Sequence, residues 1–480
     1  MNNNAPLKQR LLNLGLQIPR ILLPRKSVDL SAWAVIACDQ FTQDRRYWER
    51  VRETVGDRAS TLNLIFPEVY LESGGGQNPS GGEARRERIA AIHRNMASYL
   101  GGGIFAPPFT GGVYVERDSP HHRRRRGLVA AVDLDRYDWG ARTRSLIRAT
   151  EDTVPARLPP RMEIRRGAPL ESPHILLLID DDQDSLFSAL AGLLDSAEPA
   201  YRGKLMLDSG AVAGWRLDRE EHWTLIAEKL ESLRCRAERR YAEAAPAEGE
   251  GGEGAPFLYA MGDGNHSLAA AKGIWEEYKA AHPGEPGLAD HPLRFALVEI
   301  ENLYDPAVSF QPIHRILFNA DAGALLAALD SLPDFKAAPL EGEGALDRLR
   351  RLVGDREAPG TRLGLVSGPR LFLLETSAPG LAPVALQPLL DRFAAADGGI
   401  SIDYIHGEEE LIRLAGPREG GTGRPGGETG ATGILLPPIR AAGLFETVAR
   451  SGPLPRKSFS MGESVEKRFY LECRSLSRNP

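Results

Sequence analysis

The strongest chemical signal in the sequence lies in Phe257–Ser267, where a predicted strand runs into a tight turn that opens a predicted helix. Gly262 and Gly264 allow positive φ angles and let the backbone approach a ligand closely. The free N–H groups at the start of the helix, together with the helix dipole, favour an anion such as phosphate. We therefore expect the turn Gly262–Ser267 to be the centre of any chemistry.

The polar side chains of this turn have two interpretations. In the functional one, Asp263 holds a metal ion or a substrate hydroxyl, and His266 donates a hydrogen bond to a phosphate oxygen. In the structural one, Asn265 or Ser267 caps the helix and the turn has no ligand. Capping alone does not require an Asp, an Asn and a His side by side, and the functional interpretation is therefore preferred.

A second cluster of charged residues lies between Ile147 and His174. Arginine guanidinium groups form paired hydrogen bonds to phosphate or carboxylate, so the cluster suits an anionic ligand. Glu151 is the candidate general base, provided that burial raises its pKa towards neutrality. Surface ion pairs of little energetic value are the equally weighted alternative. The arginines concerned are Arg148, Arg157, Arg161 and Arg165.

Two later segments supply further candidates. His314 and Arg315 end the segment Ser309–Arg315, where they either point into a site or anchor the edge of a domain. Lys457 lies in Leu454–Glu463, which, with Glu466–Arg468, concentrates basic residues that could reach an anionic substrate. We count His314, Arg315 and Lys457, with Arg148, Gly264, Asn265 and Ser267, among the candidate cofactor-binding residues.

Composition narrows the class of protein. The chain of 480 residues has a formal net charge of −6, which gives no general attraction to nucleic acid or membrane surfaces. The basic run Arg123–Arg126 is expected to be a solvated hairpin tip. Three cysteines without CxxC spacing indicate neither disulfides nor a zinc site. No apolar run approaches the roughly 20 residues of a membrane helix. These features predict a soluble, cytoplasmic protein.

Several motif matches are rejected. The segment Gly421–Gly426 fits GxGxxG, but it lies in a Pro-interrupted linker with no strand before it. The sequence has no P-loop, no HExxH or paired-histidine spacing, and no GxSxG elbow for Ser-His-Asp hydrolysis. We assign no residue as a metal ligand.

Strand and helix signals alternate along the chain, some neighbouring strands being antiparallel. Strands are expected at 111–116, 128–134, 175–179, 257–261, 295–300, 363–366 and 371–374, and helices at 47–54, 185–194, 220–241 and 268–282. This pattern predicts an α/β protein, with α+β possible, built as a mixed-sheet, multi-layer fold.

At this length two or three domains are expected. We predict an N-terminal α/β region at 1–130, a core with a helical insertion at 131–318, and a C-terminal α/β region at 319–480. The Gly-rich segments 73–83, 248–254 and 416–433 are expected to be flexible loops, because they have too little apolar surface to bury.

Seven segments, in order, resemble the bacterial family of domain of unknown function 1015. They are Trp33–Thr42, Phe66–Tyr70, Arg148–Thr153, Met261–Ser267, Gln311–Arg315, Asp403–Gly407 and Pro455–Glu463. The resemblance covers most of the chain and implies family membership without an activity.

The turn also resembles the ligand turn of the ParB/sulfiredoxin fold, which includes free-serine kinases. In those kinases an upstream His-Glu segment supplies the catalytic base, and Thr150-Glu151 occupies the comparable place here. The resemblance implies a ParB/sulfiredoxin-like core in residues 131–318, with Glu151 as base and Asp263 and His266 as further catalytic residues. Two positions depart from the pattern: Ser267 stands where Arg is usual, and Thr150 where His is usual.

Two functions follow as hypotheses. The first is a phosphotransferase that uses ATP or ADP with Mg²⁺ and phosphorylates a small hydroxylated metabolite. The alternative is a non-catalytic regulator that binds a nucleotide or metabolite on the same fold. Nucleic acid and membrane are not expected as partners.

Overall fold

The computed structural model of the chain describes residues 6–71, 79–141, 143–241, 256–416 and 430–478. The chain forms two compact units. Unit 1 comprises Met1–Val308 and Gly462–Pro480, and unit 2 comprises Ser309–Met461. Unit 2 is thus an insertion between two parts of unit 1. The boundary expected at 130/131 falls inside a strand of unit 1, so the compact units divide the chain differently from the three expected regions.

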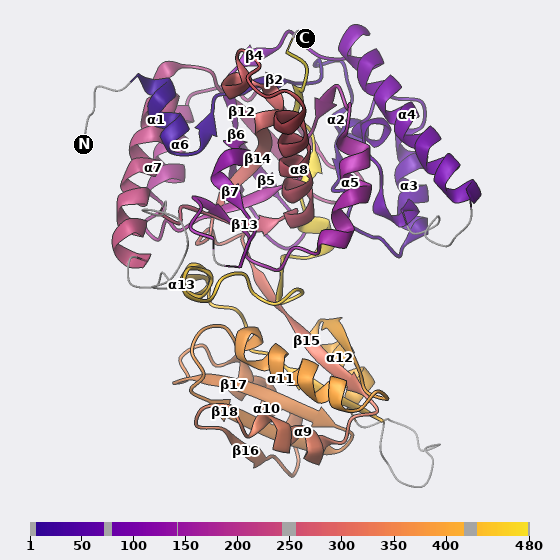
Figure 1. The fold of residues 1–480 in the computed structure, drawn as a ribbon, viewed down its shortest axis with the longest axis vertical. Coiled ribbons are helices and arrows are strands. Elements are labelled where there is room, and N and C mark those ends of the chain that lie inside the picture. Colours follow the sequence, from indigo (N-terminus) through magenta and orange to yellow (C-terminus); the bar gives the residue numbers. More distant parts are fainter. Residues whose placement is uncertain (1–5, 72–78, 142, 242–255, 417–429, 479–480) are drawn as a thin grey trace. The chain divides into compact units, whose positions relative to one another are not determined.

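A ten-stranded mixed sheet is the centre of unit 1 (Figure 1). Most neighbours are antiparallel, but β14 and β10, β13 and β8, and β8 and β7 are parallel pairs. The α/β, mixed-sheet prediction is therefore confirmed. In spatial order the strands are β11 (Tyr201–Lys204), β12 (Ala211–Leu217), β5 (Gly112–Asp118), β6 (Arg125–Asp133), β14 (Phe295–Asn302), β10 (Leu176–Ile179), β13 (Tyr259–Asp263), β8 (Ile147–Arg148) and β7 (Tyr137–Asp138), with β1 (Leu16–Gln17) paired to β6.

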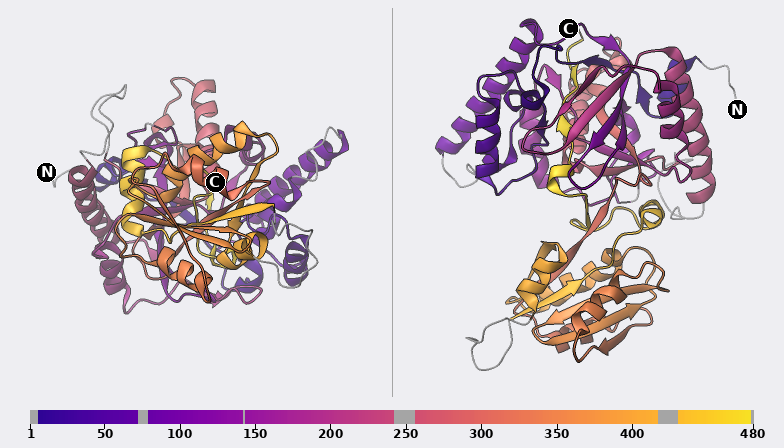
Figure 2. Two further views of the ribbon diagram at one scale, coloured as in Figure 1. Left: turned by 90° about the horizontal axis from the view of Figure 1, so that it is seen from below. Right: turned by 180° about the vertical axis from the view of Figure 1, so that it is seen from behind.

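Both faces of this sheet are covered, because its strands alternate apolar side chains between two cores. On β6, Leu128 and Ala130 belong to the first core and Val129 to the second. The first core includes apolar residues of α1 (Leu7–Asn13), α6 (Ser185–Leu194), α7 (Glu220–Tyr241) and α8 (Asn265–Ala281). The second includes those of α2 (Leu30–Trp33), α3 (Arg45–Val55) and α4 (Pro79–Gly101). Helices α1 and α7 pack side by side (Figures 1 and 2).

The C-terminal segment pairs with strands from the start of the chain. β22 (Phe469–Tyr470) pairs with β3 (Val35–Ile36). β23 (Cys473–Ser475) lies between β2 (Arg20–Leu22) and β9 (Leu170–Glu171) in a four-stranded antiparallel sheet that also contains β4 (Phe109–Thr110). The segment 469–473 is therefore part of the second core of unit 1.

Unit 2 is a seven-stranded antiparallel sheet with helices on both faces. Its strands are β16 (Lys336–Pro339), β18 (Arg370–Thr376), β17 (Thr361–Ser367), β20 (Ala431–Leu435), β15 (Phe310–Phe318) and β19 (Ser401–His406), with β21 (Phe459–Met461) paired to β15. Helices α9 (Ala322–Leu329) and α11 (Ala382–Ala396) share one core, and α10 (Ala345–Gly354) and α12 (Glu408–Ala415) share the other. Helix α13 (Ala441–Ser451) follows β20.

The expected strands and helices are present, with boundaries that move by a few residues. Two loop expectations need correction: residues 79–83 begin α4, and residues 431–433 are buried in β20. The rest of the expected loops at 73–78, 248–254 and 417–429 lies outside the described residues. No helix of the described ranges is long and apolar enough to span a membrane.

The basic run is also less exposed than expected. Arg123 and Arg124 are exposed at the hairpin between β5 and β6. Arg125, however, is buried and pairs with Glu301, and Arg126 pairs with Asp184 and Asp305. Carboxylates on neighbouring elements draw these two guanidinium groups inwards. The second half of the run is therefore part of an internal ion-pair network, whereas its first half is solvated as expected.

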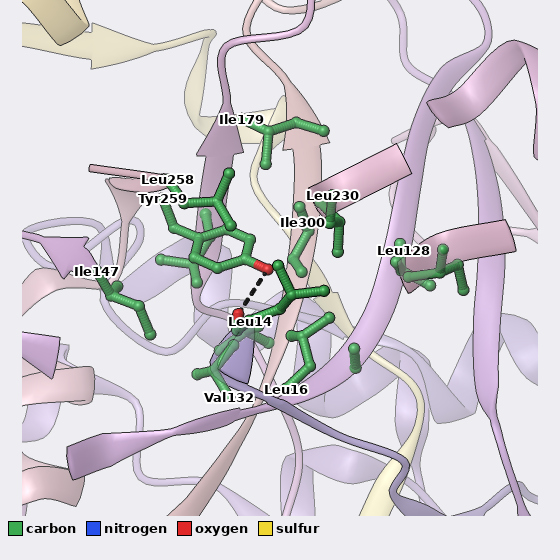
Figure 3. Packing of buried hydrophobic residues seen from close by; sticks show 14 of the residues in the cluster. Leu14, Leu16, Leu128, Val132, Ile147, Ile179, Leu230, Leu258, Tyr259 and Ile300 are labelled. Atoms are coloured by element: carbon green, nitrogen blue, oxygen red, sulfur yellow. Dashed lines mark hydrogen bonds between the residues drawn. The ribbon is translucent and has the colours of Figure 1, made fainter. Parts of the chain in front are cut away.

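A buried hydrogen bond joins β13 to the N-terminal segment. The Tyr259 hydroxyl donates to the Leu14 carbonyl oxygen over 3.0 Å inside the first core (Figure 3). Both residues are fully buried. Because β13 leads directly into the candidate turn, this bond helps to fix the strand that carries it.

Tyr259→Phe should lower the free energy of unfolding of unit 1 by about 1–3 kcal/mol, because it leaves a buried carbonyl without its donor. All six tryptophans of the chain lie in unit 1, so denaturant titration followed by tryptophan fluorescence reports this unit. Tyr278→Phe, which removes a hydroxyl bonded to Glu285 near the surface, is the control and should cost less. Equal decreases in the free energy of unfolding of the two variants would contradict the larger contribution expected from the buried bond.

Candidate functional site

The candidate turn is shorter than expected because strand and helix nearly meet. β13 ends at Asp263, Gly264 is the N-cap, and α8 begins at Asn265. Gly264 has φ 80°, in the left-handed region that disfavours other residues. A Cβ at Gly264 would also lie 3.1 Å from the Ile175 Cα. Glycine is required here by both backbone conformation and packing.

No side chain caps α8. Asn265 and Ser267 therefore do not act as helix caps in this structure. The Asn265 amide instead donates to the Glu151 carbonyl oxygen over 2.9 Å, and the Tyr137 hydroxyl donates to Asn265 Oδ1 over 3.3 Å. Ser267 Oγ shares a 2.9 Å hydrogen bond with His174 Nε2. The first N–H groups of a helix have no intrahelical acceptor. In this structure the Ser267 and Leu268 N–H groups donate to the Gly264 carbonyl oxygen over 3.0 and 3.1 Å. The N–H groups at the helix start that a ligand could use are therefore those of Asn265 and His266.

His266 is a neutral hydrogen-bond donor. The Val154 N–H donates to its Nε2 over 3.2 Å, which places the ring proton on Nδ1. Burial, together with the nearby charges of Arg161 and Arg157, lowers the pKa of His266 to about 4. At neutral pH the imidazole carries no charge, and its proton is on Nδ1.

Asp263 is part of an ion pair. Its Oδ2 lies 3.0 Å from Lys467 Nζ, and its Oδ1 accepts a hydrogen bond of 2.9 Å from the Gly264 N–H. Lys467 is buried, so the pair is largely withdrawn from water. The described ranges contain no group of three or more His, Cys, Asp or Glu side chains placed to hold a metal ion. Asp263 thus fixes the turn to the C-terminal segment.

The segment that carries Glu151 is tied to β13. The Thr150 hydroxyl donates to the Met261 carbonyl oxygen over 2.6 Å, and Asn265 holds the Glu151 carbonyl as described. Glu151 is half-buried and follows β8, a strand that runs parallel to β13. The two segments that sequence analysis singled out are neighbours.

Arg148 lies at the beginning of β13 rather than at the turn. Its Nε donates to the Ser145 carbonyl oxygen over 2.9 Å, and its guanidinium group lies over the Phe257 ring at 4.8 Å. Burial lowers the pKa of Arg148 to about 10, and Arg144 adds to the effect. Phe257 also lines a cavity of about 310 Å³ between Asp180, Arg236 and Leu258, which contains none of the turn residues.

The remaining candidates, His314, Arg315 and Lys457, belong to unit 2. His314 is buried and accepts a hydrogen bond from the Leu436 N–H over 3.1 Å, and burial lowers its pKa to about 4. Arg315 is buried, donates to Gln387 Oε1 over 2.7 Å and to the Lys457 carbonyl oxygen over 3.0 Å, and lies over the Tyr404 ring. These contacts are internal to unit 2, and a role in ligand binding stays a prediction.

Sequence reasoning named His174 and Lys467 only within charged clusters and gave Glu68 no role; in the structure His174 contacts Ser267, Lys467 contacts Asp263, and Glu68 pairs with Arg161. Glu68 accepts two hydrogen bonds of 2.5 and 2.6 Å from Arg161, yet burial raises its pKa to about 7. His174 contacts Ser267, and its Nδ1 lies 2.7 Å from the Tyr470 hydroxyl. The available signals were the family segment Phe66–Tyr70 and the charged clusters that contain His174 and Lys467, but neither showed which atoms would meet.

Comparison with known proteins gives a family without an activity. The family described as "Protein of unknown function (DUF1015)" matches residues 22–391, more than three quarters of the chain. A search of curated proteins found no match.

Three solved structures are similar at low identity. A conserved hypothetical protein from Pyrococcus furiosus has a TM-score of 0.33 and 12% identity, covering 72% of this chain and 94% of that chain. A free serine kinase in complex with AMP has a TM-score of 0.35 and 12% identity, covering 72% and 92%. SbnI with a C-terminal truncation from Staphylococcus aureus has a TM-score of 0.34 and 11% identity, covering 73% and 90%.

The burial of His266 predicts an acid-sensitive contribution to stability. Its pKa is about 4 when folded against 6.5 as the reference, so the unfolded chain binds more protons between these pH values. The contribution is complete above pH 6.5 and is lost as the pH falls to 4, by up to about 3 kcal/mol. His266→Gln, which keeps an acceptor for Val154, should lose this dependence. Fluorescence-monitored unfolding at several pH values measures it.

The control is His121→Gln, since His121 is exposed. The stability difference between the wild type and His121→Gln should not change with pH. A difference between the wild type and His266→Gln that stays constant from pH 7 to pH 4 would show that His266 is not held neutral by its surroundings.

The ion pair between Asp263 and Lys467 predicts that substitutions of the two residues have strongly non-additive effects on the free energy of unfolding. Lys467→Met should destabilise unit 1 by about 2–4 kcal/mol, because it leaves a largely buried carboxylate unpaired. Asp263→Asn should also destabilise it, and the double variant should be more stable than the sum of the two losses implies by at least about 1 kcal/mol.

The matched control for this cycle is the exposed Arg166–Glu277 pair, whose side chains are 54% and 49% exposed. Arg166→Met should cost under about 1 kcal/mol. Additive effects of Asp263→Asn and Lys467→Met would contradict a direct interaction between the two groups.

Proposed function

Because the chain belongs to the DUF1015 family, whose description assigns no activity, we propose its function from the geometry of the turn: it binds a nucleotide there and transfers a phosphoryl group to a small hydroxylated metabolite. The observation that carries the proposal is the uncapped start of α8 behind Gly264. The nucleotide is ATP or ADP. The resemblance of this turn to the ligand turn of ParB/sulfiredoxin proteins supports the same assignment.

The turn has the properties of a phosphate site. Left-handed Gly264 precedes the Asn265 and His266 N–H groups at the start of α8, which would bind an anion that also gains from the helix dipole. His266 adds a neutral donor, and the charges of Arg157 and Arg161 are near enough to lower its pKa. Arg148 stacks on Phe257 and Arg161 pairs with Glu68, so Arg157 is better placed than either to offset phosphate charge.

In the proposed reaction, the Glu151 carboxylate takes the proton of the acceptor hydroxyl. The hydroxyl oxygen forms a bond to the terminal phosphorus as the bond from that phosphorus to the bridging oxygen breaks. The products are a phosphomonoester and the nucleotide shortened by one phosphate. Donors that surround the transferred group stabilise its charge in the transition state.

Mg²⁺ would neutralise phosphate charge in such a reaction. Asp263, the carboxylate expected to hold it, is already engaged by Lys467 and the Gly264 N–H. We therefore assign Asp263 to positioning the turn, and no step is derived through a metal ion.

Glu151→Gln should lower kcat by about 10²–10⁴-fold and leave nucleotide affinity nearly unchanged, because the amide keeps the shape but accepts no proton. Calorimetry with ATP and ADP measures affinity, and product formation with a panel of hydroxylated metabolites measures turnover. Asp152→Asn is the matched control: Asp152 is the next residue, is exposed, and should retain activity.

Two outcomes would change the proposal. Tight nucleotide binding by the wild type without product from any acceptor favours the non-catalytic, nucleotide-binding regulator. No nucleotide binding at all removes both hypotheses and leaves the turn as a structural link between β13 and α8.

A further inference from the structure

Ser267 is the last side chain of the turn and one end of a buried chain of hydrogen bonds. Ser267 Oγ lies 2.9 Å from His174 Nε2, and His174 Nδ1 lies 2.7 Å from the Tyr470 hydroxyl. The Cys38 N–H donates to that hydroxyl over 3.3 Å. His174 and Tyr470 are buried, whereas Ser267 is only partly covered. The chain thus runs from the core of unit 1 out to the candidate ligand site.

A serine bonded to a histidine has two opposite chemical meanings. If Nε2 is unprotonated, it accepts the serine proton and makes the oxygen a nucleophile. If Nε2 carries the proton, it donates to the serine oxygen, and the serine proton is left for another acceptor. The tautomer of His174 decides between them, and the tautomer is set by what its Nδ1 meets.

The phenol of Tyr470 sets that tautomer. Burial raises the pKa of Tyr470 well above its usual range, so the hydroxyl keeps its proton. Its oxygen already accepts the Cys38 N–H. A proton on His174 Nδ1 would place a second N–H on that oxygen and leave only the sulfur of Cys38, a weak acceptor, for the phenolic proton. Donation from Tyr470 to His174 Nδ1 satisfies all of these groups.

The remaining proton of His174 is then on Nε2 and points at Ser267. In the described part of the chain, the Ser267 hydroxyl has no hydrogen-bond partner besides His174. Its own proton is therefore directed to whatever occupies the turn. We propose that Tyr470 and His174 are positioning residues that hold the Ser267 hydroxyl as a donor to a phosphate oxygen of the bound nucleotide. This inference rests on the proposed function.

The assignment explains how serine serves at a position where the ParB/sulfiredoxin-like pattern has arginine. Arginine would supply a charged donor, whereas Ser267 supplies a neutral one whose direction is fixed from behind. It also means that Ser267 is a binding residue and forms no covalent intermediate.

The experiment begins with ¹⁵N NMR of histidine-labelled full-length protein, in which the ring nitrogen shifts report the tautomer directly. The ring nitrogen signals of His174 are identified as those that disappear from the spectrum of His174→Gln. We expect the Nε2–H tautomer in the wild type and a mixture of tautomers in Tyr470→Phe. Tyr259→Phe, which removes another buried hydroxyl of unit 1, is the matched control and should leave His174 unchanged. An Nδ1–H tautomer in the wild type would overturn the proposal.

Calorimetry with ATP and ADP supplies the second readout. Ser267→Ala should weaken nucleotide binding by roughly 10–100-fold, as expected for one lost hydrogen bond to a charged group. His174→Gln, whose amide can still donate to Ser267, should bind more tightly than His174→Ala. If the wild type binds nucleotide and Ser267→Ala binds it with the same affinity, the inference about Ser267 is wrong while the proposed function stands. Absence of binding in the wild type would instead remove the proposed function, and with it the ligand of Ser267.

Reaction with diisopropyl fluorophosphate tests the alternative that His174 activates Ser267 as a nucleophile. A serine that donates its proton outwards should not react, so we expect no labelled Ser267 by mass spectrometry of the intact protein and its peptides. Labelling of Ser267 would identify it as a nucleophile activated by His174 and would overturn the proposal.

Discussion

The buried charges of the returning C-terminal segment hold the candidate site together. Lys467 neutralises Asp263 at the end of β13, and Arg468 pairs with Glu299 on β14 and with Glu472. Glu301, also on β14, has its pKa raised by burial, and both Asp305 and Asp263 contribute repulsion. Without cations from the last residues of the chain, several carboxylates would face one another in a medium that does not screen them. Residues 467 and 468, together with Arg125 and Arg117 beside Glu301, supply the cations that let these interior strands carry acidic side chains.

This constraint explains why the turn is so precisely placed. Gly264 lies against Ile175, the strand before it is bonded to Leu14 through Tyr259, and Asp263 is anchored by Lys467. Each contact comes from a different part of the sequence. A site that binds a phosphate with backbone N–H groups needs such rigidity, since those groups cannot move to follow the ligand. The polar side chains beside them are then free to select the ligand.

Residue types within a short window of sequence were enough to predict the helices, the strands and the turn. They were not enough to predict contacts between residues far apart in the sequence. The strand, the left-handed glycine and the helix start at 257–268 follow from residue types within one window. The same local logic made Asn265 and Ser267 capping candidates, but their side chains bond to Glu151 and His174, which only the fold brings near. Arg125 looked solvated because four arginines in a row usually are, and its partner Glu301 lies on a neighbouring strand. The contribution of Lys467 could not be foreseen, because its distance along the chain from Asp263 carries no pattern.

The way in which unit 2 is attached has a consequence for the threading of unit 1. Its first and last strands, β15 and β21, are antiparallel partners, with Phe310 opposite Met461. The two points where the insertion enters and leaves are therefore only a strand spacing apart, roughly 5 Å. A tight reverse turn of two or three residues spans such a gap. Replacing the whole of unit 2 by such a turn would therefore leave the strands of unit 1 threaded as they are.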